Sequence, residues 1–224
     1  ADADHLKLTY LDNEALSESI VKEIEKGKEK AKTSAWWANW WNVYGLGNLG
    51  SLEGVIFENW KIIDLIPNEA ELIGVGMDFG YTNDPTAIVE VYNYNGKRIL
   101  NEICYRTGLI NSEIAKMLPN GVVIYADSAE PKSIEEIRRA GKNIKGVTKG
   151  ADSIMFGIQK IQEIKFSVTS NSTNLIKEFR TWRWAVDKEG KQLGTPIDKD
   201  NHAIDALRYI ALNKINKSSK IELL

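Results

Sequence analysis

The sequence has few of the features that mark several common protein classes. Its 224 residues include one cysteine, Cys104, which excludes an internal disulfide framework. No apolar run reaches the roughly 18 residues that a membrane-spanning helix needs. The first ten residues, ADADHLKLTY, lack the basic segment followed by an apolar one that is typical of a secretory signal. We therefore expect a buried cysteine, a reducing cytoplasm and no contact with a membrane.

An excess of charge of one sign is also missing. The 29 Lys and Arg residues nearly balance the 31 Asp and Glu residues, giving a net charge of −2, so charge alone does not indicate a nucleic-acid binder. Basic residues are concentrated in two stretches, 132–165 and 177–191. Each stretch is equally typical of a solvated helix face. The length and composition suit one globular domain with an attached segment.

The N-terminal 70 residues have a pattern of their own. Apolar residues at helical spacing predict a helix over residues 14–33. Trp36, Trp37, Trp40 and Trp41 follow it, and they can share a helix face of the kind that packs against a neighbouring domain. Residues 1–70 are therefore predicted to be a helical, Trp-rich linker.

Residues 71–217 alternate between strand and helix patterns. Three consecutive strands are expected at 72–80, 86–94 and 98–107, with a tight turn at Asn95-Gly96. The later expected segments are helices near 111–118, 131–141, 151–164 and 173–181, strands at 122–127, 143–148 and 166–169, a hairpin at 181–196, and a helix at 200–215. This order predicts an α/β fold: an antiparallel three-strand meander plus parallel strands in one mixed sheet, flanked by helices, with residues 218–224 as a tail.

Three aspartates occupy places where a carboxylate needs a partner. Asp78 and Asp127 each end an apolar strand, and Asp205 lies among apolar residues of the last helix. Ligands collect at strand ends of open sheets, and a charge in an apolar setting is costly unless it is paired or bound to a cation. Converging carboxylates favour hard divalent cations such as Mg²⁺ and Mn²⁺. His202 precedes Asp205 by three residues, on the same helix face, where it could be a further ligand or a proton shuttle.

Each of these residues also has a purely structural interpretation. Asp78 could be an ordinary turn residue, and Asp127 could cap a loop. Asp205 could simply pair with Arg208, and His202 could cap its helix. Both interpretations stay open at this point.

The order of these motifs resembles a known family. GMDFGYTNDPTAIVEV, then VVIYADSAEPKSIEEIRRAG, then DKDNHAIDALRY, is similar to the nuclease domain of the terminase large subunits of tailed double-stranded-DNA phages. The resemblance implies a ribonuclease-H-like fold and two-metal-ion cleavage of double-stranded DNA during genome packaging. It also implies that Asp78, Asp127 and Asp205 bind Mg²⁺ or Mn²⁺, with His202 in an auxiliary role.

The same resemblance implies DNA contacts and partners. The expected hairpin corresponds to a family element thought to meet DNA. The implied DNA-binding residues are Lys132, Lys149, Arg180, Arg183, Lys188 and Lys191. The phage portal protein and the small terminase subunit would be partners of the full-length enzyme, in the cytoplasm of the infected bacterial host. No G-x-x-x-x-G-K-S/T phosphate loop occurs, so we expect a piece without the ATPase motor.

Three other functions remain open. The same fold serves resolvases, ribonucleases H and recombinase cores, which differ in substrate. The motif DFGYTND also resembles a phosphate loop of actin-like ATPases, although about 150 residues leave no room for the second lobe of such a protein. Finally, the chain could be a non-catalytic docking module of the packaging motor.

Overall fold

The computed structural model describes residues 9–32, 41, 45–46, 54–147, 150 and 153–215. The chain divides into two compact units: Ala1–Val55 with Arg183–Ile197, and Ile56–Trp182 with Asp198–Leu224. Lys149 and three of the four clustered tryptophans, Trp36, Trp37 and Trp40, lie outside the described residues. The division into a linker, a nuclease domain and a tail remains a prediction.

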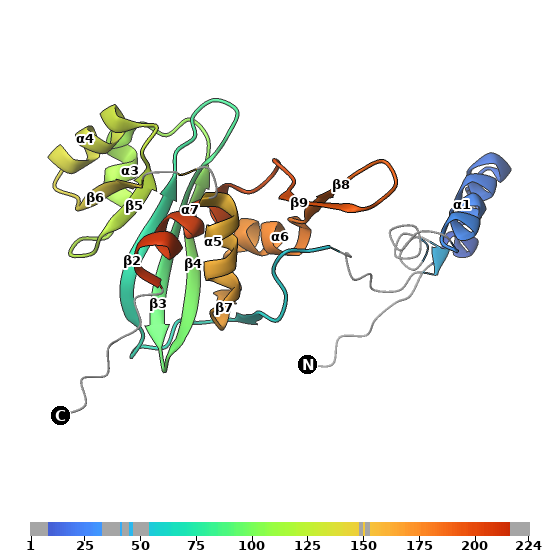
Figure 1. Cartoon of the computed structure of the whole chain (residues 1–224), viewed down its shortest axis with the longest axis horizontal. Coiled ribbons are helices and arrows are strands. Elements are labelled where there is room, and N and C mark those ends of the chain that lie inside the picture. Colours follow the sequence, from blue (N-terminus) through green and yellow to red (C-terminus); the bar gives the residue numbers. More distant parts are fainter. Residues whose placement is uncertain are drawn as a thin grey trace. The chain divides into compact units, whose positions relative to one another are not determined.

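The larger unit is built on a seven-stranded mixed sheet (Figure 1). Its strands, in spatial order, are β1 (Lys61–Ile63), β7 (Phe166–Thr169), β4 (Lys97–Arg106), β3 (Thr86–Tyr94), β2 (Glu71–Asp78), β5 (Ile124–Asp127) and β6 (Ile144–Val147). The β2–β3 and β3–β4 pairs are antiparallel, and the other neighbours are parallel. The predicted fold class, a meander extended by parallel strands, is therefore confirmed.

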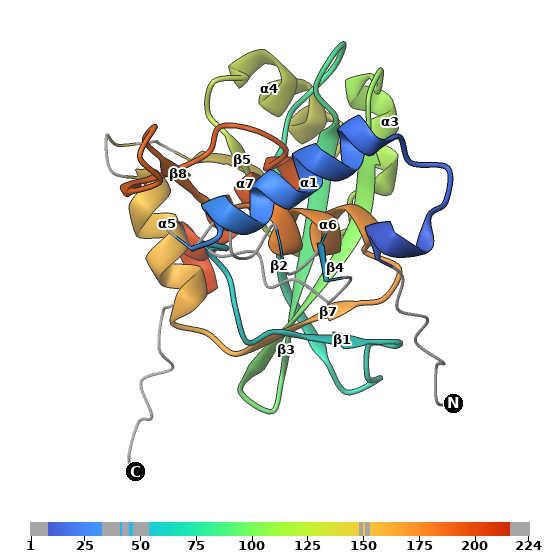
Figure 2. The ribbon, with the colours of Figure 1, turned by 90° about the vertical axis from the view of Figure 1, so that its right-hand side faces the viewer.

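The three strands of the meander form where they were predicted. Its β3–β4 turn has positive φ at Asn95 (49°) and Gly96 (74°), the backbone that a two-residue hairpin needs. Cys104 on β4 is buried, as expected. The edge strand β1 was not predicted, because three residues are too few to show a pattern; it lies beside β7 (Figure 2).

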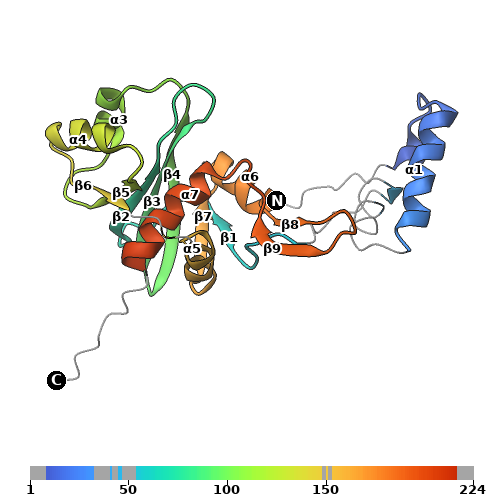
Figure 3. The same ribbon diagram turned by 45° about the horizontal axis from the view of Figure 1, so that its top comes forward.

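Helices cover both faces of the sheet. On one face, α3 (Asn111–Met117) and α4 (Pro131–Arg139) share an apolar core with Val75 and Met77 of β2. On the other face, α7 (His202–Ile210) lies across β2, β3 and β5, with α5 (Ser153–Gln162) and α6 (Thr173–Thr181) packed against it (Figure 3). A π-helical turn, Ala211–Ile215, extends α7.

Two glycines explain how closely α7 approaches the sheet. Side chains alternate along a strand, so Val75 and Met77 face one side while Gly74, Gly76 and Asp78 face the other. A Cβ atom on Gly76 would lie 1.8 Å from the backbone oxygen of Ala206, so the helix rests directly on the strand backbone there. The sequence GVGMD thus docks α7 two residues before Asp78.

The smaller unit contains α1 (Glu18–Lys30) and the hairpin of β8 (Trp184–Val186) and β9 (Gln192–Pro196). The predicted helix at 14–33 and hairpin at 181–196 are both present, with shorter bounds. Trp41, the described member of the tryptophan cluster, has its ring centroid 6.0 Å from that of Tyr10. Within the described part of the chain, no helix combines the length and hydrophobicity needed to cross a membrane.

Candidate active site

Asp78 ends β2 on the face that α7 covers. Its Oδ1 accepts a hydrogen bond of 3.3 Å from the Tyr209 hydroxyl, and its Oδ2 lies 3.2 Å from Nδ1 of His202. Only 13% of the Asp78 side chain is exposed, so both contacts are shielded from water. Because α7 rests on Gly76, its residues His202 and Tyr209 reach the end of the strand. The candidate aspartate and the candidate histidine, 124 residues apart, are therefore brought together.

Asp205 lies in the first turn of α7 and is held by an arginine. Its Oδ1 accepts a hydrogen bond of 3.0 Å from Nε of Arg208 and lies 2.9 Å from Nη2. The Arg208 side chain is 4% exposed, and it packs so tightly over α5 that a Cβ atom on Gly157 would lie 3.1 Å from it. The pairing of Asp205 with Arg208, considered as the structural interpretation, does occur. It fixes the carboxylate and does not exclude a site role.

Asp127 ends β5, the parallel neighbour of β2. The register pairs Met77 with Ala126, so Asp78 and Asp127 follow paired residues at the same edge of the sheet. Oδ1 of Asp127 accepts a hydrogen bond of 3.0 Å from the backbone N–H of Ala129. This contact is the loop-capping role that the sequence also allowed.

Tyr209 is the group that all three aspartates influence. The pKa of its phenol is raised, first by burial and then by the negative charges of Asp78, Asp205 and Asp127. Carboxylates on β2, β5 and α7 thus all disfavour ionisation of the phenol, which stays protonated and donates to Asp78. Sequence reasoning did not single out Tyr209. Its position was the available indication, because it follows Asp205 by four residues and so shares its helix face.

His202 lies between two carboxylates. Besides Asp78, its ring meets Asp84, whose Oδ1 is 3.6 Å from Nε2. The pKa of His202 is raised, mainly by its hydrogen bond to Asp78, and burial acts in the opposite direction. The imidazole therefore holds a proton more readily than a free histidine.

The donor chemistry of this edge suits a hard cation. The three aspartates offer carboxylate oxygens only, the ligands that Mg²⁺ and Mn²⁺ favour. Within the described ranges, however, no three His, Cys, Asp or Glu side chains already form a cluster that could hold a metal ion. The aspartates are turned toward protein partners: Asp78 toward Tyr209 and His202, and Asp205 toward Arg208. These partners fix the orientation of the Asp78 and Asp205 carboxylates.

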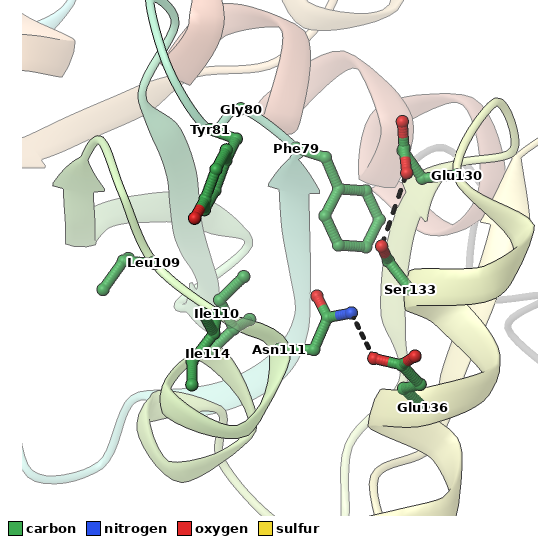
Figure 4. Close-up of a pocket in the computed structure, with 10 residues that line it drawn as sticks. All are labelled: Phe79, Gly80, Tyr81, Leu109, Ile110, Asn111, Ile114, Glu130, Ser133 and Glu136. Carbon is green, nitrogen blue, oxygen red and sulfur yellow. Dashed lines mark hydrogen bonds between the residues drawn. The ribbon is translucent and has the colours of Figure 1, made fainter.

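A cavity of about 430 Å³ adjoins this edge. It opens between the loop after β2, the start of α3 and the first turns of α4, and Phe79, the residue after Asp78, forms part of its wall (Figure 4). Its charged lining residues are acidic: Glu136 accepts a hydrogen bond of 2.7 Å from Asn111, and Glu130 faces Ser133. The carboxylates make this wall unfavourable for a DNA phosphate.

The predicted DNA-binding residues fall into two groups. Lys132 on α4 and Arg180 on α6 are exposed in the larger unit. Lys188 and Lys191 are exposed at the tip of the hairpin in the smaller unit, where Asp187 holds the turn by accepting the Lys191 N–H at 2.8 Å. Arg183 is half-buried just before β8. Their contact with DNA remains a prediction.

Comparison with known protein families identifies the family to which the larger unit is similar. The sequence profile described as "Terminase RNAseH like domain" matches residues 78–213, a span that begins at Asp78 and contains Asp127, His202 and Asp205. The chain belongs to this family. The resemblance inferred from the sequence motifs is thereby confirmed.

Two individual proteins similar to this terminase domain are themselves terminase large subunits. It is 33% identical over 219 residues to the terminase large subunit of Bacillus phage SPP1, covering 90% of this chain and 50% of that protein. It is 30% identical over 141 residues to the PBSX phage terminase large subunit of Bacillus subtilis, covering 60% of this chain and 33% of that protein. The chain thus spans half the length, or less, of these two curated relatives.

A solved structure of a terminase nuclease domain has a similar fold. The nuclease domain of the SPP1 large terminase, crystallised with bound Mn, is 31% identical to this terminase domain, with a TM-score of 0.60. The match covers 68% of this chain and 95% of that structure. The similarity therefore extends over almost the entire SPP1 nuclease domain.

Proposed function

We propose that this chain is a metal-dependent endonuclease that cleaves double-stranded DNA during phage genome packaging. One observation carries the proposal: Asp78 and Asp127 end neighbouring parallel strands at one edge of the sheet, and α7, which carries Asp205, contacts Asp78 through His202 and Tyr209. The family match and the Mn-bound SPP1 relative support a nuclease at this edge of the sheet. The proposed boundaries are 1–70 for the linker, 71–217 for the nuclease domain and 218–224 for the tail.

Asp78, Asp127 and Asp205 would hold one or two Mg²⁺ or Mn²⁺ ions. Such ions, when bound, lower the pKa of a coordinated water and offset negative charge on the phosphate. The chain's own groups keep the ligands ready. The Tyr209 O–H orients Asp78, and the Arg208 guanidinium holds Asp205 and balances its charge in a buried setting.

His202 is suited to moving a proton beside these ligands. Its Nδ1 contacts Asp78, which fixes the ring, while Nε2 is the nitrogen that points away from Asp78, toward Asp84. The raised pKa favours the protonated ring, whose Nε2 proton would go to a leaving 3′ oxygen. His202 is thus proposed as auxiliary acid, not as a principal ligand.

DNA would be held mainly through its phosphates. Lys132, Arg180 and the hairpin residues Lys188 and Lys191 are exposed cations available for this purpose, with Lys149 and Arg183 as further candidates. A net charge of −2 predicts weak binding by the isolated chain, with a strong dependence on salt. In the infected host's cytoplasm, the portal protein, the small terminase subunit and the motor would hold the substrate in place.

The proposal is tested by cleavage of supercoiled plasmid in EDTA, Mg²⁺ and Mn²⁺. We expect nicking and linearisation only with a divalent cation, and none by Asp78→Asn. Glu71→Gln is the matched control, because Glu71 is an exposed carboxylate at the opposite end of the same strand, and it should cut like the wild type. Cleavage by Asp78→Asn at the wild-type rate would overturn the proposal. Preferential cutting of junctions or RNA–DNA hybrids would instead indicate a resolvase or a ribonuclease H.

A further inference from the structure

A buried carboxylate lies outside the proposed ligand set. Glu178 on α6 is 2% exposed, although acidic residues are almost never fully buried without partners. Its neighbours Leu175, Ile176 and Phe179 form the buried face of the helix, so Glu178 interrupts an apolar stripe. Burial raises the pKa of Glu178 to about 7, while its hydrogen bonds act in the opposite direction. Because burying a carboxylate is energetically costly, we expect Glu178 to have a specific role.

The partners of Glu178 are at the start of the helix that carries the site. Its Oε2 accepts a hydrogen bond of 2.8 Å from the backbone N–H of Ile204. Its Oε1 accepts one of 3.2 Å from the N–H of Ala203 and one of 2.9 Å from the Tyr105 hydroxyl on β4. The carboxylate thus joins α6, β4 and the first turn of α7. The two α7 partners lie between His202 and Asp205 in the chain.

The first turn of α7 has no cap of its own. Backbone N–H groups in the first turn of a helix lack intrahelical partners and are normally satisfied by a local side chain. Asn201, at the N-cap position, makes no side-chain cap, and its amide nitrogen donates to Asp205 Oδ1 at 3.3 Å. Glu178 fills this role from another helix, and in its ionised form it also suits the positive end of the helix dipole.

We propose that Glu178 is a positioning residue: its carboxylate fixes the first turn of α7 and thereby sets His202 and Asp205 against Asp78. The inference rests on the proposed nuclease function. It goes beyond ordinary helix capping because the anchored turn is the segment that bears two site residues. Asp205 must stay near the end of β2 to act with Asp78, and displacement of catalytic groups by about 1 Å can cost about 100-fold in rate.

The test compares Glu178→Gln and Glu178→Leu with the wild type and with Ile137→Val. Gln keeps the shape and one acceptor oxygen, whereas Leu keeps the bulk and accepts no hydrogen bond. Ile137, fully buried on α4, controls for a loss of stability away from α7. Three quantities are measured below the unfolding temperature: kcat and KM for plasmid cleavage, affinity for Mn²⁺ alone, and amide hydrogen exchange at Ala203 and Ile204.

A positioning role predicts a graded result. Glu178→Leu should lower kcat by about tenfold or more with KM for DNA little changed, weaken Mn²⁺ binding and speed exchange at both amides. Glu178→Gln should fall in between, and Ile137→Val should match the wild type in all three. If Leu prevents folding, the Gln variant alone carries the comparison. Wild-type kcat and Mn²⁺ affinity in the folded Glu178 variants would overturn the positioning role.

Failure of the nuclease proposal can be distinguished from failure of the positioning proposal. If the wild type itself cleaves no DNA with Mn²⁺, the nuclease proposal fails, and Mn²⁺ affinity and amide exchange still decide the positioning role. Unchanged exchange at Ala203 and Ile204 in Glu178→Leu would then refute it independently of any catalysis.

Discussion

Replacing Gly76 by alanine tests whether the approach of α7 to β2 builds the site. An ideal Cβ atom at Gly76 would lie 1.8 Å from the backbone oxygen of Ala206 and 2.6 Å from its carbonyl carbon. Both are backbone atoms, so no side-chain rotation relieves the clash. Carbon and oxygen come no closer than about 3.3 Å, so the helix must move by about 1.5 Å. That displacement carries His202, Asp205 and Tyr209 away from Asp78.

The expected loss has two parts. Overpacking of this kind costs about 1–3 kcal/mol of unfolding free energy, and a backbone clash belongs at the upper end. A misplacement of the ligands by more than about 1 Å should lower kcat by about 100-fold in molecules that remain folded. Urea unfolding measures the first quantity, and Mn²⁺-dependent plasmid cleavage below the unfolding temperature measures the second.

Gly74→Ala is the matched control on the same strand and face. Its Cβ atom would meet Cδ1 of Ile210 at 2.9 Å, the end of a flexible side chain, and the Val123 oxygen at 3.3 Å. A small side-chain adjustment suffices there, so we expect a loss of about 1 kcal/mol or less and nearly normal cleavage. Equal kcat and equal stability for the two alanine variants would refute the argument that Gly76 sets the position of α7.

Three further predictions concern charged groups. Because the pKa of Glu178 is about 7 in the folded protein and 4.5 without its surroundings, it contributes stability below pH 4.5 that is lost as pH rises through 7. Between pH 4 and 8, the unfolding free energy of the wild type should therefore fall by about 3 kcal/mol relative to that of Glu178→Gln. A difference between the two proteins that does not change with pH would contradict this assignment. Arg208→Met should cost about 3 kcal/mol in urea unfolding, because it leaves Asp205 without its guanidinium, and Mn²⁺ should restore part of the loss; a neutral effect would show that the pair contributes nothing. Replacing Lys188 and Lys191 by alanine should reduce the slope of log affinity for duplex DNA against log salt by about 2 in fluorescence anisotropy, and an unchanged slope would remove the hairpin from the DNA interface.

The sequence indicated most of the fold because its patterns were local. Strand-like segments marked β3 and β4, Asn95-Gly96 marked their turn, and Pro131 marked the start of α4. The strand β1 was missed because its three residues are too few to show a pattern, and its pairing with β7 joins segments about 100 residues apart.

The candidate site was predictable only in part. Strand ends and helix spacing indicated Asp78, Asp127, Asp205 and His202, but not which of their contacts would form. Tyr209 and Glu178 were missed because their roles arise from the packing of α7, which depends on the glycines of β2 and on α6. An acidic residue among Leu175, Ile176 and Phe179 was the visible irregularity.

Plasmid linearisation by Asp127→Asn in Mn²⁺ tests the central claim most directly. Asp127 caps a loop through Ala129, and Asn can keep that contact while losing the charge that a cation requires. Three cooperating carboxylates predict that the wild type linearises the plasmid while the equally stable variant leaves it intact. Cutting by Asp127→Asn at the wild-type rate would show that Asp127 only caps its loop and that the three aspartates do not form the proposed centre.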